Sequence, residues 1–334
     1  MLLASVILVV VLALAFDYIN GMHDTANAIA TVVSTRVLSP RNAIILATVL
    51  NFVGALWSEA VAKTIGKGIV DPSVIHQSTV MAALIAAITW NLITWYYGIP
   101  SSSSHALIGG VIGATIATVG ASQLHADGIT KVVKGLIFSP IIGGGIAFLI
   151  MMAILWGFRN VPPGKSNRWF KGLQMVSASV MAFSHGMGDA QKSMGIIVMA
   201  LLASGFMDPA HVHVPMWVKL SCALAMAFGT ASGGWRIIKT LGHKMIKLQP
   251  VHGFAAEAAA SAVILTASSW GIPVSTTHSI SGAIMGVGLT RRLNSVRWDI
   301  AGQMVFAWVL TIPASGLIGY GSVKLLVLVF PGLA

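Results

Sequence analysis

The sequence predicts an all-α polytopic membrane protein built from two inverted-topology repeats, each with a broken helix and a re-entrant helical hairpin. Hydrophobic residues make up 56% of the chain and charged residues only 9%, against roughly 25% charged residues in soluble domains. Several apolar runs approach the ~20 residues that a membrane-spanning helix needs. In addition, three short sequence signatures occur twice, in the same order, in the two halves of the chain.

The net charge of +11 is high for a chain with so few charged residues. Such a balance raises the question of nucleic-acid binding, but the basic residues are scattered through short loops between apolar segments. That distribution is typical of membrane orientation. We therefore expect a lipid bilayer, and no nucleic acid, as partner. The single cysteine, Cys222, excludes an intramolecular disulfide and a cysteine-based metal cluster.

The first half begins with an apolar stretch, residues 1–35, that lacks the basic start and the small-residue cleavage site of a signal peptide. We expect it to be retained as a helix that is interrupted at residues 20–27, around Asp24. A second span is expected over residues 43–62.

A first hairpin is predicted around the sequence GIPSSSSH at residues 98–105, which lies between apolar arms at 79–97 and 102–119. Proline disfavours helix in the residue before it and suits the first turn of a new helix, and serine favours the N-cap. A helix should therefore end here and another begin. The new N-terminus exposes unpaired N–H groups and a partial positive charge, which favour an anion.

The remaining elements repeat this order. We expect a continuous span at 135–157, a polar connector, a helix at 172–206 with a second polar interruption, a span at 217–234, a second hairpin at 253–290 and a last span at 300–330. The chain is accordingly divided into a first repeat at 1–134, a linking span and cytoplasmic connector at 135–171, and a second repeat at 172–334.

Matching signatures support the two repeats. Gly21, Met22 and Asp24 match Gly186, Met187 and Asp189; KTIG at 63–66 matches KTLG at 239–242; GIPSSSSH at 98–105 matches GIPVSTTH at 271–278. Both hairpin motifs continue into glycines at the same spacing, Gly109 and Gly113 in one and Gly282 and Gly286 in the other. One such match arises easily by chance, whereas three in order do not.

The positive-inside rule tests whether the halves are inverted. We set both termini outside, let each hairpin return to its own side and count residues 135–157 as one crossing. The cytoplasmic side then receives Arg36, Arg41, Arg159, Lys165, Arg168, Lys171, Arg236, Lys239, Lys244, Lys247, Arg291, Arg292 and Arg297, and the outside receives Lys63, Lys67, Lys131, Lys134, Lys219 and Lys324. This excess favours inverted halves. Inverted repeats with broken helices that meet at the midplane are typical of secondary transporters.

Hydroxyl groups at the two hairpin N-termini are the expected donors to a bound oxyanion. They belong to Ser102, Ser103, Ser104, Ser275, Thr276 and Thr277. Ordinary capping of two helices that start in the membrane explains one such motif, but duplication in opposite orientation favours an oxyanion site. His105 and His278 either relay protons or pin the hairpins to backbone carbonyls, and the sequence leaves both roles open.

Asp24 and Asp189 are the strongest candidates for ion coupling. A charged residue at the centre of a membrane helix costs roughly 2.5–3.5 kcal/mol on insertion scales and commonly marks an ion or proton route. Two carboxylates beside a bound anion repel it unless cations or protons lie between them. The pair therefore predicts cation-coupled symport, with a cation site at the two aspartates. Lys192 either pairs with Asp189 or contacts the anion, and Glu257 is expected to take part in coupling.

Two other classes of protein remain open. A membrane enzyme that uses Asp24 and Asp189 with a metal would convert its substrate without accumulating it, although no GxSxG, HExxH or Walker-type motif is present. A channel would pass the anion only downhill. Uphill uptake driven by a proton or sodium gradient distinguishes a symporter from both.

These motifs resemble the inorganic phosphate transporter (PiT) family, whose halves each carry a GxND-type motif and a P-x-S-x-S/T-H hairpin. Residues 16–31 (FDYINGMHDTANAIAT) are similar to the start of the bacterial low-affinity phosphate permease branch, and residues 184–192 (SHGMGDAQK) resemble the second family motif. The resemblance covers essentially the whole chain. It implies a symporter that imports inorganic phosphate, alone or as a metal–phosphate complex, with protons or sodium as the coupling ion and no other cofactor. It also implies a homodimer in the inner (plasma) membrane.

The resemblance assigns roles to individual residues. Substrate binding falls to the six hairpin hydroxyls together with Asn27, Gln191 and Lys192, and cation or proton coupling to Asp24, Asp189, Glu257, His23 and Asn51. His23 and Gly188 stand where sodium-coupled relatives usually have Asn, and Asn51 stands where some have Glu. The loss of those oxygens favours protons over sodium. A sulfate permease of the same family is the alternative, because phosphate and sulfate are both tetrahedral.

Overall fold

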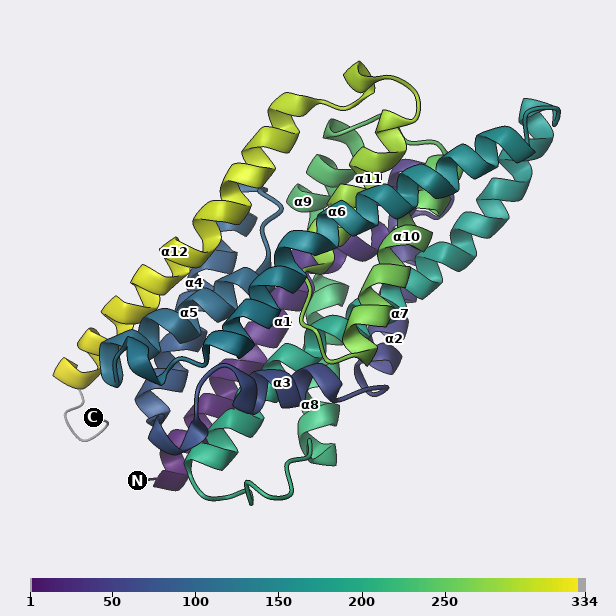
Figure 1. The fold of residues 1–334 in the computed structure, drawn as a ribbon. Helices are drawn as coiled ribbons and strands as arrows, with labels where there is room; N and C mark the ends of the chain where they lie inside the picture. The colour runs from purple at the N-terminus through teal and green to yellow at the C-terminus, as the bar shows by residue number, and fades with distance from the viewer. Residues whose placement is uncertain (1, 330–334) are drawn as a thin grey trace.

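The structure is a computed structural model that describes residues 2–329 (Figure 1). The α-helices are α1 (Leu2–Ser34), α2 (Pro40–Ala55), α3 (Ala60–Gly68), α4 (Gln77–Tyr97), α5 (Ser103–Thr118), α6 (Ala126–Gly157), α7 (Pro163–Ala203), α8 (Met216–Ser232), α9 (Trp235–Lys239), α10 (Pro250–Ser269), α11 (Thr276–Leu289) and α12 (Trp298–Val329). Short helical turns are η1 (Pro72–Val74), η2 (Ala121–Gln123), η3 (Thr240–Lys244) and η4 (Leu293–Ser295). Within the described residues there is no β-strand.

The length and surface of these helices confirm a polytopic membrane protein. By length and composition, α1, α4, α6, α10 and α12 can each cross a membrane, and α2 with α3 can form a further, bent span. Large apolar side chains are exposed on the outer helices, for example Ile141 (63%) on α6 and Leu317 (75%) on α12. A bilayer is the solvent that accepts such a surface, because its interior is as apolar as a protein core.

The helix interruptions expected at residues 20–27 and in the matching part of the second half are wrong. α1 continues unbroken through Asp24, and α7 continues unbroken through Asp189. Neither stretch contains proline, and the polar side chains find partners on neighbouring helices, so the backbone has no reason to leave the helix. The break of the first half comes one helix later. α2 ends at Ala55 rather than at residue 62, and the chain bends by 67° into α3.

Both hairpins form where the sequence predicts them. α4 ends at Gly98, which adopts a left-handed conformation with φ +66°, and α5 follows with Ser102 as its N-cap. α10 is followed by Gly271 at φ +64°, and α11 begins after the N-cap Ser275. A positive φ suits glycine, which has no Cβ to clash. In each hairpin the second arm is the shorter one, with 16 residues in α5 and 14 in α11.

Each short arm packs against the long helix that follows the hairpin of the other half. α5 lies along α12, and α11 lies along α6 (Figure 1). The repeated glycines allow this close approach: an added Cβ at Gly113 would collide with Gly316 of α12, and one at Gly286 would collide with Gly144 of α6. In the same way α1 packs on α8, and α7 packs on α2. Every major contact of one half thus has a counterpart in the other.

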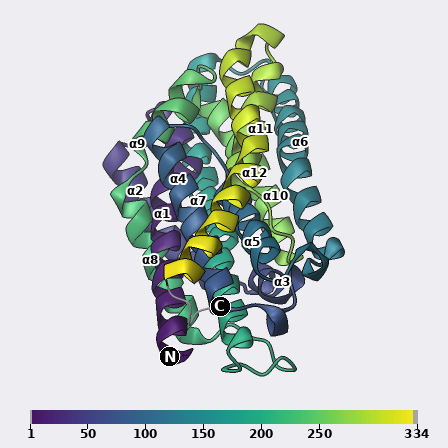
Figure 2. The same cartoon turned by 90° about the vertical axis from the view of Figure 1, so that its left-hand side faces the viewer.

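The two ends of the bundle differ. The first turn of α1 and the last turn of α12 lie at the same end (Figures 1 and 2), while the connection from α6 to α7 extends beyond the bundle at the other end (Figure 1). With 41 residues, α7 is about 60 Å long, roughly twice the thickness of the hydrocarbon core. The helix expected to begin at residue 172 begins earlier, at Pro163, because proline suits the first turn of a helix. Most of the expected polar connector is therefore helical, and its basic residues lie at the protruding end. Cys222, in α8, is fully buried.

Candidate functional site

The N-terminal ends of the two short hairpin arms meet inside the bundle. The Ser104 hydroxyl of the first hairpin donates a hydrogen bond of 3.3 Å to the carbonyl of Val274 in the second. The rings of His105 and His278 lie 4.5 Å apart, measured between centroids. Both first turns are buried. Two segments far apart in the sequence thus form one junction of helix N-termini, which we call the hairpin junction.

Asp24 of α1 faces the hairpin junction. Its carboxylate accepts a hydrogen bond of 3.1 Å from the Ser103 hydroxyl of the first hairpin and one of 3.4 Å from the Thr277 hydroxyl of the second. His23 Nδ1 lies 2.6 Å from the same carboxylate, and His23 Nε2 lies 3.1 Å from the hydroxyl oxygen of Thr94. Asp24 is 2% exposed, so its carboxylate depends on buried hydrogen-bond partners.

Asp189 of α7 reaches the hairpin junction from the other half. The Thr276 hydroxyl donates to its carboxylate at 3.1 Å, and Lys192 Nζ donates at 2.6 Å. His185 Nε2 lies 3.5 Å from the same carboxylate. All of these side chains are buried. Of the two roles that the sequence left open for Lys192, the structure shows the ion pair with Asp189.

Two asparagines connect these groups. The Asn27 amide donates to the hydroxyls of Thr277 at 2.9 Å and Thr276 at 3.3 Å, while its own side-chain oxygen is buried without a hydrogen-bond partner. The Asn51 amide donates to Thr230 at 2.9 Å, and its oxygen lies 3.1 Å from His185 Nδ1. Asn27 therefore lines the hairpin junction, whereas Asn51 touches it only through His185.

Three of these side chains can share one cation. A carboxylate oxygen of Asp24, one of Asp189 and a ring nitrogen of His185 lie within 4.8 Å of one another. Carboxylate and imidazole together suit transition-metal ions, and carboxylate oxygens suit hard cations. The sequence indicated the two aspartates but not His185. Its position four residues before Asp189, on the same helix face, was the available signal.

The side chain of Gln191 forms its hydrogen bonds with the backbone of α3 and α7. Its side-chain oxygen accepts the backbone N–H groups of Val61 at 2.8 Å and Ala62 at 3.3 Å, and its amide donates to the Met187 carbonyl at 2.7 Å. These contacts satisfy the free N–H groups at the start of α3, as a capping residue does. In the structure, the hydrogen bonds of the Gln191 side chain are thus all to backbone groups. The hydroxyls of Ser102 and Ser275 are likewise engaged with backbone, since they cap α5 and α11.

Glu257 of α10 forms a second buried polar group. Its carboxylate accepts hydrogen bonds from Thr31 at 2.5 Å, from Gln174 at 3.3 Å and from Ser177. Within residues 2–329 no basic side chain forms an ion pair with it. Thr31 follows Asp24 by two helical turns, about 10 Å along α1. The sequence did not indicate the three partners, although the seven-residue spacing on one face of α1 links Thr31 to Asp24.

A helical bundle that buries facing aspartates, a lysine and two helix N-termini at one junction defines a membrane transport protein. Comparison with known proteins agrees. A model of the "Phosphate transporter family" matches residues 20–163 and 158–319. The chain belongs to this phosphate transporter family.

Individual relatives extend over nearly the whole chain. The chain is 50% identical over 320 residues to a probable low-affinity inorganic phosphate transporter of Bacillus subtilis, covering 95% of this chain and 96% of that protein. It is 48% identical over 311 residues to one of Rhizobium meliloti, covering 92% of each. Among solved structures, one named "The sodium-dependent phosphate transporter" is similar with a TM-score of 0.91 and 25% identity, covering 98% of this chain and 100% of that one. All three are named as transporters, so the protein is a transporter rather than an enzyme.

Proposed function

We propose that the protein is a secondary active symporter that imports inorganic phosphate across the inner membrane, with protons or sodium as the coupling ion. One observation carries the proposal: the N-termini of two hairpins from different halves converge on two buried aspartates. Helix N-termini and hydroxyls attract an oxyanion, and the aspartates supply charges that only a cation can balance. The names of the relatives support phosphate as that oxyanion.

The substrate donors in this proposal are the hydroxyls of Ser103, Thr276 and Thr277, with Asn27 between them. Each now contacts a carboxylate or a neighbouring hydroxyl, and each can turn to a phosphate oxygen when the anion enters the hairpin junction. The N–H groups at the start of α5 and α11 that lack helical partners add donors without a net charge. Lys192 balances Asp189, so that this aspartate does not repel the bound anion.

The coupling ion binds, in this proposal, between the phosphate and the aspartates. The contact of His23 with Asp24 at 2.6 Å favours protons, because an imidazole ring at this place supplies no oxygen ligand for sodium. The grouping of Asp24, His185 and Asp189 supports a cation site that would also accept the metal of a metal–phosphate complex. Sodium has support from the similar solved structure, which is named as sodium-dependent. The three ions differ in what drives uptake, so experiment separates them.

Glu257 is proposed as a second coupling group. A carboxylate buried in a membrane protein with three neutral donors and no cationic partner is costly when charged. Its hydrogen-bond partner Thr31 lies two helical turns after Asp24 on α1. Glu257 therefore offers a second position for a cation, between the hairpin junction and one end of the bundle.

We also propose that the two halves are inverted repeats. α1 begins at the end of the bundle where α7 finishes (Figure 1), and the main helix contacts of one half recur in the other. With the basic connector cytoplasmic, both termini face outside. The two hairpins then enter the membrane from opposite sides.

Uptake of labelled phosphate into proteoliposomes tests the proposal. Accumulation that persists without sodium and collapses with a protonophore identifies protons; accumulation only with a sodium gradient identifies sodium; a requirement for divalent metal identifies the complex. Equilibration without accumulation would identify a channel. If sulfate inhibits uptake of labelled phosphate at the same concentration as arsenate does, the transporter accepts tetrahedral oxyanions in general. Preferential transport of sulfate would overturn the assignment to phosphate.

A further inference from the structure

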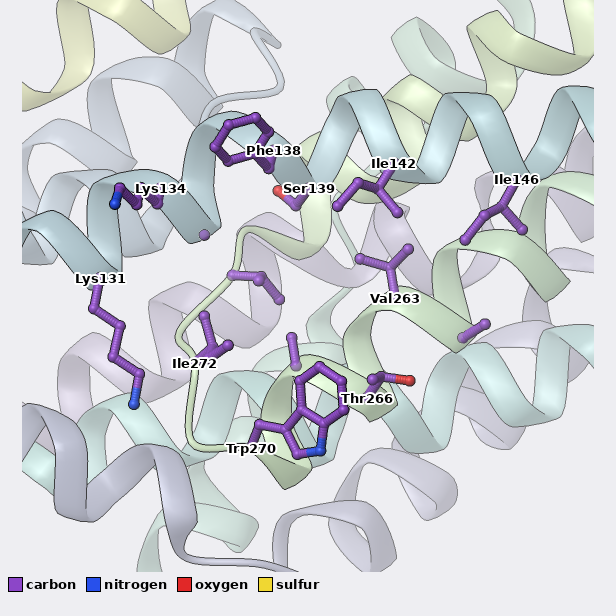
Figure 3. Close-up of a pocket in the computed structure, with 14 residues that line it drawn as sticks. Lys131, Lys134, Phe138, Ser139, Ile142, Ile146, Val263, Thr266, Trp270 and Ile272 are labelled. Carbon is purple, nitrogen blue, oxygen red and sulfur yellow. The ribbon is translucent and has the colours of Figure 1, made fainter.

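A cavity opens between α6 and α10 on a side of the bundle that faces the bilayer (Figure 3). Its volume is about 530 Å³, which is within the range of ligand pockets. α6 contributes one wall and α10 the other, and the turn of the second hairpin closes one side. Next to the cavity, Ile137 and Ile141 of α6 are 56% and 63% exposed. The opening therefore leads to lipid.

The cavity has a charged end and an apolar length. Lys131 and Lys134, both near the start of α6, lie at the same end, while Phe138, Ile142 and Val263 line the remainder (Figure 3). None of the residues that line it, all within the described part of the chain, is acidic. An occupant that matches this wall has a negative group at one end and a hydrocarbon chain behind it.

The corresponding gap in the other half is bridged. Counted from the hairpin motifs, Trp90 of α4 corresponds to Val263 of α10. Thr311 of α12 corresponds to Ser139 of α6 by packing, because each lies five residues before the glycine, Gly316 or Gly144, that meets the short hairpin arm. The Trp90 indole N–H donates to the Thr311 hydroxyl at 3.0 Å and so joins α4 to α12. Val263 is too short to join α10 to α6, and the Ser139 hydroxyl turns back to the Leu136 carbonyl. The cavity thus follows from a valine where the other half has a tryptophan.

We propose that this cavity binds one anionic phospholipid. Its phosphate group lies at Lys131 and Lys134, and one acyl chain lies along Phe138, Ile142 and Val263. Basic pockets between membrane helices bind anionic headgroups. From Lys134 to Ile142 the wall extends about 12 Å along α6, which fits within one ~15 Å leaflet of the hydrocarbon core.

The lipid would contact the hairpin junction through the turn that lines the cavity. Ile272 and Val274 of that turn face the cavity. The Val274 carbonyl accepts the hydrogen bond from Ser104 of the first hairpin, and the next residue, Ser275, caps α11. An acyl chain packed against this turn holds it in the position that brings the two hairpins together. Loss of the lipid should therefore slow phosphate uptake without changing which anion is transported.

Native mass spectrometry of the purified protein with phosphatidylglycerol or phosphatidylcholine tests the proposal. The wild type is expected to retain phosphatidylglycerol selectively. Val263→Trp installs the side chain that the other half carries and should abolish retention. The double variant Lys131→Gln/Lys134→Gln should weaken retention about thirtyfold, since each lysine near an anionic headgroup contributes about 1 kcal/mol. Lys324→Gln removes an exposed lysine of α12 outside the cavity and should have no effect.

Three outcomes would overturn the proposal: equal retention of phosphatidylcholine, retention of phosphatidylglycerol by the Val263→Trp variant, or release of the lipid by inorganic phosphate. Release by inorganic phosphate would mean that the two lysines bind free phosphate rather than a lipid headgroup. Ile142→Trp narrows the cavity from the α6 side and repeats the test if Val263→Trp does not fold. In proteoliposomes, phosphatidylglycerol should raise uptake by the wild type and leave the Val263→Trp variant unchanged.

Discussion

The two halves bring an aspartate to the same junction but neutralise it differently. Asp24 has His23, the residue immediately before it, at 2.6 Å. Asp189 has Lys192 at 2.6 Å, and Lys192 stands where the first half has Asn27. An ammonium group has donors only, whereas an imidazole ring can bond a carboxylate through one nitrogen and a second group through the other. The second half thus ends its aspartate in an ion pair with Lys192, whereas the first half links its aspartate through His23 to Thr94 of the first hairpin.

The largest expected effect is on transport itself. Asp24→Asn and Asp189→Asn keep the shape of the side chain but remove the charge that binds the coupling cation. Each variant should reduce accumulation of labelled phosphate in proteoliposomes to the level of empty vesicles, with unchanged membrane insertion. Gln191→Ala, which alters a residue engaged with backbone, is the control and should keep measurable uptake. Normal accumulation by either aspartate variant contradicts its coupling role.

The same two substitutions should differ in stability. Asp189→Asn leaves the Lys192 ammonium buried without its partner, which costs about 3–5 kcal/mol. Asp24→Asn keeps a side-chain oxygen beside His23 and leaves no ammonium group unpaired, so the loss should be nearer the ~1–3 kcal/mol of a broken buried hydrogen bond. Thermal unfolding in detergent measures both. The double variant Asp189→Asn/Lys192→Met should regain most of the stability and none of the uptake. Equal destabilisation by the two single variants would remove the distinction between the halves.

A smaller effect is expected from the link through His23. His23→Gln removes the ring that contacts Asp24 with one nitrogen and Thr94 with the other. The rate of phosphate uptake should fall about two- to tenfold, because one buried hydrogen bond contributes roughly 0.5–1.5 kcal/mol. His213→Gln, which alters an exposed histidine of the loop before α8, is the control and should be neutral. Uptake at the wild-type rate by His23→Gln argues against a role for this link.

The smallest expected effects are on stability, at the helix caps where the two halves have the same structure. Ser102 and Ser275 cap α5 and α11 through the same contact, with the backbone N–H of His105 at 3.2 Å and of His278 at 3.1 Å. Ser102→Ala and Ser275→Ala should each lower stability by about 1 kcal/mol. Ser269→Ala, an exposed serine outside the caps, should be neutral. A clearly larger loss for one cap in thermal unfolding shows that the two hairpins are not equivalent.

Local chemistry in the sequence predicted the hairpins well. Proline and serine fix where a helix ends and another begins, and these signals depend only on adjacent residues. Their convergence was also predictable, because the motif is duplicated. The helix breaks expected beside Asp24 and Asp189 were wrong, since the partners that keep those polar residues helical come from distant segments. Thr277 contacts Asp24, for example, from the other half of the chain.

The site residues likewise divide into those that local sequence marks and those that only tertiary packing brings to the site. Asp24 and Asp189 are recognisable because an acid in an apolar run is costly. No local sequence pattern marks His185 or the partners of Glu257 as site residues, because tertiary packing brings each of them to its carboxylate. Gln191 shows the converse: its motif suggested a ligand, but the bend between α2 and α3 exposes N–H groups at Val61 and Ala62 that need an acceptor. No local pattern announces that bend.

The burial of Cys222 has a practical consequence. The chain has one cysteine, and the structure gives its thiol no access to the surface. A membrane-impermeant maleimide should consequently leave the native protein unlabelled. A cysteine introduced into a loop would then be the labelled residue, and Cys222 need not be removed first. Labelling of a cysteine placed in the turn between α6 and α7 would show which side of the bilayer this turn faces, and so the orientation of the protein.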